Sequence, residues 1–509
     1  LLICLPFSLV QAQTVKVNGR VTDDLNEPMI GVSIVEKGTA NGCITDIDGN
    51  YTLNVKQGAT LVYSYIGYVA LERKAVAGVM NIILKEDAQA LDEVVVVGYG
   101  VQKKSSVTGA ISQVKSEDIQ NRSITRAEEA LQGKTAGVQL VSTTSQPGSS
   151  PTIRIRGFSS NGTSDPLYVV DGLIVNDLSS IDPNNIKSME VLKDAASAAI
   201  YGAQAGNGVV LITTKSGSQG TSSISYDFQY SINSLARRPE LLNSQEYLTQ
   251  MKEADPTFTD VNIRELISNG VWDGVSSTDW YDVAFNASPA SRHTVTFQGA
   301  NDKGSYFLSL NNLYDNGIIR EDRDTYKRLS VMLNADYKIK PWLKVGTTAN
   351  YANYTSKAIS DGSGGTSYVS MIATVMTLAP YIADTYPADA LPTQMQAQIA
   401  NGFTLLQNAN GDYYSCLGTM EQVHPMVAIR MNDKKNTGNS LMGTLYANFT
   451  PIKDLVFTTR LGYRIATDNT YTHNNLYYGS ASASNKDRNG VTRTSLSTTY
   501  YQWENFVNY

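Results

Sequence analysis

The sequence has very little cysteine and histidine, with only three residues of each among 509. The cysteines lie far apart and form no CxxC pair, so they indicate neither a disulfide framework nor a metal site. The histidines are equally scattered, and no nucleophile motif or metal-ligand spacing accompanies them. These six residues are Cys4, Cys43, Cys416, His293, His424 and His473. We therefore expect no catalytic residues, no metal, no cofactor and no enzymatic activity.

Long apolar runs are also missing after the first ten residues, where none approaches the roughly 20 residues that a membrane-spanning helix needs. Charged residues make up only 17% of the chain and the net charge is −6, which gives no reason to expect a nucleic-acid partner. Tyrosine and glycine are abundant, with 30 and 39 residues, and the mean hydropathy is −0.22. This composition excludes a helical membrane protein and is typical of a β-rich protein with aromatic surfaces.

Residues 1–12 contain the apolar core of a secretory signal peptide, without a start methionine or a basic segment. Their last three residues resemble an A-x-A cleavage site, which predicts cleavage near Ala12–Gln13. Cys4 does not indicate a lipoprotein, because Ile3 is bulkier than the small residue expected before a lipidated cysteine. We therefore expect an exported protein, with a signal-peptide remnant at residues 1–12, and a sequence that is a fragment.

Residues 14–86 alternate apolar and polar positions between turn signals, as expected for about five to seven short strands. The pattern predicts a small all-β sandwich. The stretch Asp46 to Gly49 (DIDG) has two acidic residues, but the further ligands of a calcium-binding loop are absent at the required spacing. We therefore interpret this stretch as a hairpin turn.

The next notable segment is Leu91 to Gly100, with the sequence LDEVVVVGYG. Four consecutive β-branched residues favour a strand, and no turn signal ties this strand to a neighbour. An unpaired strand can accept a strand from another protein; the alternative is an ordinary buried strand of a flanking domain. The partner-binding interpretation covers Leu91, Asp92, Glu93, Val94, Val95, Val96, Val97, Gly98, Tyr99 and Gly100.

Residues 101–217 alternate short strands with short helices, which predicts a compact α/β domain. A helix is expected over Thr125 to Lys134, because Thr125 is a suitable N-cap and Gly137 follows the end. A second helix, rich in small residues, is expected over Lys193 to Tyr201. Strands are expected at 152–155, 167–170 and 208–215.

Residues 221–509 consist of segments of about ten residues that alternate apolar and polar positions, as lipid-facing barrel strands do. The links between the segments are alternately long and short, and this matches the extracellular loops and periplasmic turns of an outer-membrane barrel. A soluble sandwich is the alternative, although it gives no reason for such alternation. The eight expected strands are 222–234, 291–300, 304–314, 326–339, 343–355, 439–449, 455–467 and 494–509.

Several motifs together resemble a known family. Residues 19–53 are similar to the carboxypeptidase-regulatory-like domain, a non-catalytic sandwich. The blocks PTIRIRGF (151–158), PLYVVDGLIV (166–175) and IDPNNIKSMEVLKDAASAAIYGAQAGNGVVLITTKSG (181–217) resemble the plug of TonB-dependent outer-membrane transporters. With the leading sandwich and VVVVGYG, the resemblance is to the SusC/RagA-like branch, which imports oligosaccharides or oligopeptides.

The resemblance implies roles for particular residues. Residues 91–100 become the TonB box, and 101–217 the plug. Twenty-two barrel strands are implied, and eight are too few to enclose a plug, so residues 221–509 are expected to be the first part of a barrel truncated at its end. We expect Arg154 and Arg156 to bridge plug and barrel wall rather than to contact substrate. The implied plug motifs are Arg154, Arg156 and Gly157 (RIRG) and Asp171 and Gly172 (VDG).

The implied activity is energy-coupled import across the outer membrane, driven by TonB and shared with a SusD-like surface lipoprotein. Aromatic residues in the long loops suit sugar rings, although an interfacial girdle or loop packing explains them equally well. Alternatives are a siderophore, haem or vitamin receptor, and a non-transporting adhesin or scaffold. The aromatic candidates for glycan or peptide contact are Trp272, Trp280, Tyr281, Tyr413 and Tyr414.

Overall fold

The computed structural model divides the chain into two compact units, Leu1–Val95 with Val101–Thr108, and Val96–Gly100 with Gly109–Tyr509. Among the described residues, no helix is both long and apolar enough to cross a membrane. The residues that the structure describes are 14–23, 27–39, 41–65, 68, 70–85, 94–97, 100–103, 111–120, 122–142, 144, 146–157, 164–217, 220–359, 371–417 and 422–509.

The first unit is the predicted sandwich of short strands. One sheet has the order β4-β1-β7, with β8 also pairing with β1, and the other has the order β3-β2-β5-β6. Apolar side chains at alternate positions, such as Leu53 and Val55 of one sheet and Ile34 and Leu61 of the other, fill one core between them. The strands are β1 (Thr14–Thr22), β2 (Ser33–Glu36), β3 (Gly42–Ile44), β4 (Asn50–Lys56), β5 (Thr60–Ser64), β6 (Leu71–Lys74), β7 (Gly78–Val79) and β8 (Ile82–Ile83).

The turn before β4 is closed by Asp46. Its Oδ1 accepts hydrogen bonds from the backbone N–H groups of Asp48 (3.0 Å) and Asn50 (2.8 Å). Gly49 has a φ of +75°, which a glycine adopts without steric cost. The structure therefore confirms a turn at residues 46–49, but the prediction of a hairpin is wrong, because β3 and β4 on its two sides belong to different sheets and do not pair.

The valine-rich segment forms β9 (Val94–Val97), as predicted. The expectation that this strand lacks a partner is wrong, because β9 pairs with β10 (Gly100–Lys103) in a two-stranded sheet. The partner strand was missed because its own residues show no strong strand pattern. Leu91, Asp92, Glu93, Gly98 and Tyr99 lie outside the described residues.

The plug is a small α/β domain built on a five-stranded sheet with the order β11-β16-β17-β14-β15, beside a two-stranded sheet of β12 and β13. Apolar residues of β16, β17 and the segment after β11 form its buried core. Its elements are β11 (Ile111–Lys115), α1 (Ser116–Gln120), η2 (Ala127–Leu131), β12 (Val138–Val141), β13 (Thr152–Ile155), β14 (Leu167–Val170), β15 (Leu173–Val175), η3 (Pro183–Asn185), β16 (Ile186–Leu192), α2 (Ala195–Ala198), η4 (Ala199–Ala205) and β17 (Val209–Thr214).

The three predicted plug strands are confirmed, but both predicted helices differ in detail. The first is a 3₁₀ helix of five residues, whose N-cap is Arg126 rather than Thr125. The second begins after Asp194, whose side chain accepts a hydrogen bond from the Ser197 N–H, and it continues as a 3₁₀ helix kinked at Gly202. Arg126 is buried and donates to the Gly148 carbonyl and to Ser150 Oγ. These tertiary contacts override the local helix signals.

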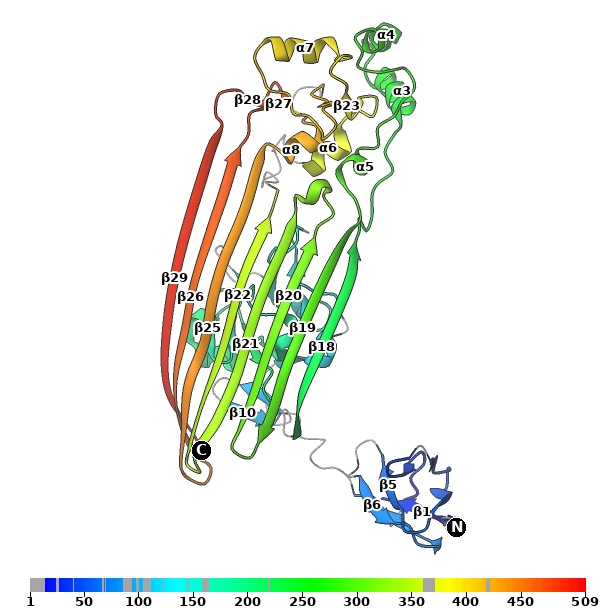
Figure 1. Ribbon diagram of the computed structural model, residues 1–509, viewed down its shortest axis with the longest axis vertical. Coiled ribbons are helices and arrows are strands. Elements are labelled where there is room, and N and C mark those ends of the chain that lie inside the picture. Colours follow the sequence, from blue (N-terminus) through cyan, green and yellow to red (C-terminus); the bar gives the residue numbers. More distant parts are fainter. Residues whose placement is uncertain are drawn as a thin grey trace, which may run out of the picture. The chain divides into compact units, whose positions relative to one another are not determined.

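The remainder of the chain forms one antiparallel sheet of eight strands, in sequence order from β18 to β29 (Figure 1). Each of these strands pairs with the next of the eight along the chain, so all eight predicted strands are confirmed. They are β18 (Gly220–Asn233), β19 (Ser288–Asn301), β20 (Gly304–Asn316), β21 (Thr325–Lys340), β22 (Leu343–Lys357), β25 (Asn432–Ile452), β26 (Leu455–Asn474) and β29 (Gly490–Asn508).

Short turns join the strands at one end of the sheet, and long loops join them at the other (Figure 1). The predicted alternation of link lengths is therefore confirmed. The loop elements are α3 (Ser244–Ala254), α4 (Asp260–Ser268), α5 (Trp280–Ala284), η5 (Arg320–Asp322), α6 (Met371–Thr377), β23 (Thr385–Tyr386), α7 (Thr393–Ala400), β24 (Tyr413–Tyr414), α8 (Pro425–Ala428), β27 (Tyr477–Ser480) and β28 (Ala483–Asn485).

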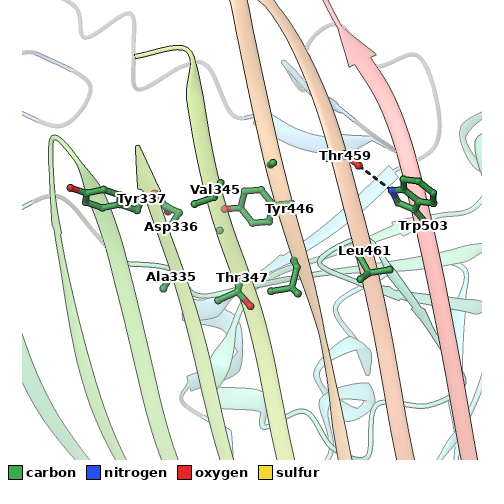
Figure 2. A pocket seen from close by; sticks show the side chains of 12 residues that line it. Ala335, Asp336, Tyr337, Val345, Thr347, Tyr446, Thr459, Leu461 and Trp503 are labelled. Carbon is green, nitrogen blue, oxygen red and sulfur yellow. Dashed lines mark hydrogen bonds between the residues drawn. The ribbon is translucent and has the colours of Figure 1, made fainter. Parts of the chain in front are cut away.

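The two faces of this sheet differ in chemistry. One face, here called the outer face, exposes large apolar side chains at alternate positions, for example Leu445 (50%), Leu461 (42%) and Trp503 (74%). Figure 2 shows a hollow of about 570 Å³ on it, where the Trp503 indole donates to Thr459 Oγ1 over 3.0 Å. The opposite, inner face carries buried polar residues at the intervening positions, including Arg328 and Asn334. An outer face of this kind suits lipid.

Candidate functional site

The plug is held against the inner face of the sheet by a buried ion pair. Asp182 is the N-cap of η3, and its Oδ1 accepts from the Asn184 N–H over 2.9 Å. Its Oδ2 lies 2.6 Å from Nη2 of Arg328 on β21, and both side chains are fully buried, with 0% exposure. The other guanidinium arm of Arg328 donates to the Ser179 carbonyl over 2.9 Å. One arginine of the sheet therefore fixes the plug segment 179–184.

Amide side chains of the inner face add neutral hydrogen bonds to the plug. Asn334 Nδ2 donates to Thr214 Oγ1 and to the Lys215 carbonyl, both over 2.7 Å. Asn350 Nδ2 donates to the Ser180 carbonyl over 2.9 Å. Apolar contacts cross the same interface: Met442 of β25 is a buried member of the plug core, and Tyr500 of β29 packs against that core. Plug and sheet are thus joined by both polar and apolar contacts.

The predicted VDG turn lies at this interface. Asp171 and Gly172 join β14 to β15 and have φ values of +48° and +86°, as a two-residue type I′ hairpin turn requires. The Asp171 carboxylate accepts from the N–H (3.0 Å) and the hydroxyl (2.6 Å) of Thr214. Burial raises the pKa of Asp171, whereas these hydrogen bonds and the nearby Arg460 oppose the rise. The turn is therefore locked to β17 within the plug.

Gly172 also touches the sheet directly. Its carbonyl accepts a hydrogen bond from Gln502 Nε2 of β29 over 3.0 Å. A Cβ atom at this position would lie 1.6 Å from Nη1 of Arg460 on β26, so no other residue fits without displacing that arginine. The positive φ favours glycine at this position, and a larger residue would also have to move the end of the Arg460 side chain.

The predicted RIRG residues lie elsewhere on the plug. Arg154 of β13 forms an ion pair with Asp165 over 2.7 Å, inside the plug. Arg156 is exposed and has a φ of +56°, and Gly157 follows with +92°. The charged bridges between plug and wall that the structure shows come from the wall, through Arg328 and also Arg292, which donates to the Ile124 carbonyl. A wall contact of Arg154 or Arg156 stays a prediction.

The long loops pack into a cluster of their own. Trp280 of α5 is buried, its indole N–H donates to the Ala379 carbonyl over 3.2 Å, and its ring meets the His424 ring edge-on. His424 Nδ1 accepts from the Met426 N–H (3.0 Å), and Nε2 lies 2.9 Å from Asp384. Burial lowers the pKa of His424, although Asp384 opposes this effect. The β18–β19 loop and two parts of the β22–β25 loop are thus joined around the His424 imidazole.

Charged groups continue this cluster towards its rim. Arg430 Nε donates to Glu321 Oε2 over 3.0 Å, and its guanidinium lies 4.7 Å from the centre of the Tyr414 ring. Tyr414 in turn donates to Glu321 Oε1 over 3.3 Å. Glu321 belongs to η5, so this contact ties the β20–β21 loop to the β22–β25 loop.

The five aromatic candidates for substrate contact differ in how far their side chains are exposed. Trp272, Trp280 and Tyr414 are buried, with exposures of 6%, 1% and 5%. Their rings are occupied by loop packing, which was the alternative interpretation. Tyr281 and Tyr413 are partly exposed, and substrate contact by these two stays a prediction.

The residues that join plug and wall carry no local signal that marks them in the sequence. Asp182 was visible in the DPNNI block, but nothing local marks it as a buried acid. Arg328 and Asn334 were detectable only as polar residues on the inner side of an alternating strand, where a lumen-facing side chain and a plug contact look the same. Among the described residues, no group of three or more His, Cys, Asp or Glu side chains could hold a metal ion.

Comparisons with known proteins agree with this architecture. Residues 103–209 match the TonB-dependent Receptor Plug Domain, and residues 17–96 match the CarboxypepD_reg-like domain. The chain is 34% identical over 488 residues to the TonB-dependent receptor SusC of Bacteroides thetaiotaomicron, covering 92% of this chain and 47% of that protein. It is 34% identical over 417 residues to the TonB-dependent receptor P3 of Formosa agariphila, covering 80% of this chain and 40% of that protein.

Solved structures show the same fold. The RagAB peptide importer in its open-open state aligns with a TM-score of 0.66 at 24% identity, over 82% of this chain and 46% of that chain. The RagAB peptide transporter aligns with a TM-score of 0.61 at 25% identity, over 73% of this chain and 42% of that chain. The chain thus spans about half the length of the proteins that it matches.

A plug domain beside the polar face of an antiparallel sheet with an apolar outer face defines a TonB-dependent receptor. Within this class, the chain belongs to the SusC/RagA-like receptors, as its leading CarboxypepD_reg-like domain and its identity to SusC show.

Proposed function

We propose that this chain belongs to an outer-membrane transporter that imports oligosaccharides or oligopeptides with energy supplied through TonB. The proposal includes the domain limits predicted above: a signal-peptide remnant at 1–12, a sandwich at 14–86, the TonB box at 91–100, the plug at 101–217 and barrel strands from 221. A SusD-like surface lipoprotein would share the substrate at the loop end. The relatives support this proposal because they are receptors or importers, and none is named as an enzyme.

The observation that carries the proposal is the set of neutral hydrogen bonds by which the sheet holds the plug. A plug that must move under force has to leave its wall and return. Separating an apolar interface costs about 25 cal/mol per Å² of surface exposed, whereas each neutral hydrogen bond that exchanges for water contributes only about 0.5–1.5 kcal/mol. Contacts such as those of Asn334 and Asn350 can therefore be replaced by water when the plug is displaced.

The TonB box supplies the point of attachment in this proposal. Strand pairing with a partner requires backbone N–H and C=O groups rather than particular side chains. β9 already forms strand hydrogen bonds with β10, so TonB would either add to this two-stranded sheet or take the place of β10.

Deletion of residues 93–99 in the full-length protein tests the function. Uptake of the substrate should be abolished, while binding at the cell surface stays intact, because the deletion removes the attachment point and leaves the loops unchanged. Val96→Pro should reduce uptake strongly, since proline lacks the N–H that strand pairing needs. Val96→Thr is the matched control, because threonine keeps both the N–H and β-branching. Normal uptake by the deletion variant would refute TonB coupling.

Growth of a knockout strain on defined nutrients tests the substrate class. Loss of growth on one glycan or one peptide, with unchanged growth on chelated iron, is the expected result. Loss of growth on the chelated metal alone would instead support a siderophore or haem receptor.

A further inference from the structure

A small cavity lies between the plug and the inner face of the sheet. Its volume of about 20 Å³ is enough for one particle of the size of a water molecule. The plug contributes residues around β14, β15 and β17 to its lining, and the sheet contributes residues of β21, β22 and β25, so the cavity exists only while plug and sheet are in contact. The polar side chains of the lining belong to Asp171, Thr214, Asn334, Thr348 and Asn350.

Two amide oxygens of this lining have no hydrogen-bond partner among the described residues. Asn334 and Asn350 are buried, with exposures of 6% and 5%, and the Oδ1 atom of each is unpaired. The other end of each amide fixes its orientation. Asn334 Nδ2 donates to Thr214 Oγ1 and the Lys215 carbonyl, and Asn350 Nδ2 donates to the Ser180 carbonyl. A buried acceptor without a partner is costly, so both oxygens are expected to bind a ligand in the cavity.

The strand register brings the two asparagines together. Asn334 of β21 lies directly opposite Thr348 of β22, and Asn350 is two residues further along β22. The two asparagines are therefore diagonal neighbours on the same face of the sheet, with backbones about 7–8 Å apart. At this spacing, both side-chain oxygens can contact one small ligand.

The carboxylate of Asp171 supplies negative charge at the same cavity. The residue as a whole is half-buried, but its carboxylate is removed from water. One carboxylate oxygen accepts from the N–H of Thr214 and the other from the Thr214 hydroxyl, as an ionised carboxylate does. Arg460 lies nearby, but its guanidinium pairs with Glu504 over 3.6 Å. Among the described residues no ion pair includes Asp171, so one negative charge is left without a counter-ion, which is costly away from water.

The chemistry of the lining selects the ligand. Both hydrogens of Asn334 Nδ2 are donated, and the Thr214 hydroxyl donates to Asp171. The groups left over are mainly acceptors, and carboxylate and amide oxygens are the ligands that hard cations prefer. A water molecule could donate to both amide oxygens, but it would leave the charge of Asp171 unbalanced. A divalent ion would exceed that charge, whereas a monovalent ion balances it.

We propose that this cavity binds one monovalent metal cation, such as sodium, with Asp171, Asn334 and Asn350 as side-chain ligands. Because the oxygens come from both plug and sheet, the ion is bound only while the plug is in place. Binding therefore stabilises the plug against the sheet by mass action, and displacement of the plug releases the ion. This inference rests on the contacts between plug and sheet, and it does not depend on TonB or on the imported substrate.

Hydrogen exchange of the full-length protein in detergent tests the site. The exchange is compared in sodium chloride and in choline chloride of the same ionic strength, with EDTA present to remove divalent ions. Choline is too large for the cavity, so it controls for screening. Peptides that contain residues 171–184 and 210–215 should exchange about tenfold more slowly in about 0.3 M sodium chloride, which corresponds to a sodium concentration about ten times the Kd. Equal exchange in the two salts would overturn the inference.

A pair of variants locates the effect. Asp171→Asn keeps the size of the side chain and suits the positive φ of +48°, but it removes the charge. The sodium effect should then shrink to within about twofold of no effect. Asp177→Asn makes the same charge change at an exposed position of the plug and should retain the full effect. An equal sodium effect in the two variants would assign it to another place and overturn the site.

Thallium(I) provides a measurement that needs no variant, because it is a monovalent cation with strong anomalous scattering. Crystals of the wild-type full-length protein soaked in thallium nitrate should show an anomalous peak between Asp171, Asn334 and Asn350. Water density without an anomalous peak at this position would overturn the inference. Uptake that proves independent of TonB would refute the proposed function and would leave the thallium result unchanged, so the two failures can be told apart.

Discussion

At the scale of single residues, Arg328 and Asp182 form a buried ion pair between sheet and plug, with 0% exposure on both sides. A buried charge is costly unless it is paired and hydrogen-bonded, and removal of one partner leaves the other uncompensated. Asp182 also caps η3, so its carboxylate connects local plug structure to the sheet.

Asp182→Ala should therefore release the plug from the wall. We expect a loss of about 3–5 kcal/mol in the free energy that holds the plug in place, since Arg328 would remain buried without its partner. Faster protease cleavage of residues 179–184 in the full-length protein would measure this loss. The double variant Asp182→Leu, Arg328→Met should recover much of the stability, because it leaves no buried charge.

The ion pair of Arg154 and Asp165 differs from the buried pair because it is in contact with water. The Asp165 side chain is 54% exposed, and pairs in contact with water contribute about 1 kcal/mol or less. Asp165→Ala should leave the protease sensitivity of the plug close to that of the wild type. Equal effects of the Asp182 and Asp165 variants would contradict the role given to the buried pair.

At the scale of elements, the β20–β21 loop contains a carboxyl group whose protonation is coupled to its structure. Asp324 is buried, its Oδ1 accepts from the Ile319 N–H over 3.2 Å, and its carbonyl accepts from the Gly317 N–H over 2.8 Å. Burial raises the pKa of Asp324 to about 7, and the neighbouring Asp315 adds to this rise, whereas the backbone hydrogen bonds oppose it.

The stability of this loop should fall as pH rises. Between an unfolded pKa of about 4 and the folded value of about 7, the open loop releases a proton that the closed loop retains. The contribution of the protonated carboxyl is full below pH 4 and is lost by pH 7, with a total on the order of 4 kcal/mol. Hydrogen exchange at the Gly317 and Ile319 amides should accelerate over this range beyond the intrinsic effect of pH.

Asp324→Asn tests the source of that dependence. The amide keeps an acceptor for the Ile319 N–H but cannot titrate, so the extra acceleration should disappear. Asp302→Asn, at an exposed turn on the other end of the sheet, is the control and should retain it. An unchanged pH profile in the Asp324 variant would assign the effect to another group.

At the scale of the whole molecule, the chain separates into two compact units with their own cores. In the first unit, the Tyr51 and Tyr63 hydroxyls, one from each sheet, lie 2.7 Å apart, and the Tyr51 hydroxyl also donates to the Met80 carbonyl over 2.8 Å. Its two sheets are thus joined by polar as well as apolar contacts, with no requirement for the plug.

Residues 14–86, expressed alone, should fold cooperatively into the sandwich. A domain of this size has a free energy of unfolding of roughly a few kcal/mol. Tyr63→Phe removes the hydrogen-bond partner of the Tyr51 hydroxyl and should lower the free energy of unfolding by about 1 kcal/mol. The urea midpoint should therefore fall. Circular dichroism during urea unfolding measures both the cooperativity of folding and the midpoint. A disordered fragment would contradict the proposed domain limits.

Much of the fold could be predicted from the sequence because its signals are local. The alternation of apolar residues such as Leu441 and Leu445 with polar residues predicts a strand with one apolar face. The lengths of the links predict at which end of the sheet the long loops lie. The Asp171-Gly172 pair predicts a tight turn, since both positions need a positive φ. These features depend on residues that are close in the chain, so they can be recognised without coordinates.

What the sequence by itself determined is therefore the eight long strands, their periodicity and the family. Only the tertiary structure decided which residues meet: Asp182 with Arg328 across 146 positions, Trp280 with His424, and Asn334 with Thr214. It also paired β9 with β10 and buried three of the aromatic loop residues. The reason is physical: burial, and the partner of a charge, depend on packing between segments distant in the chain, which no local pattern records.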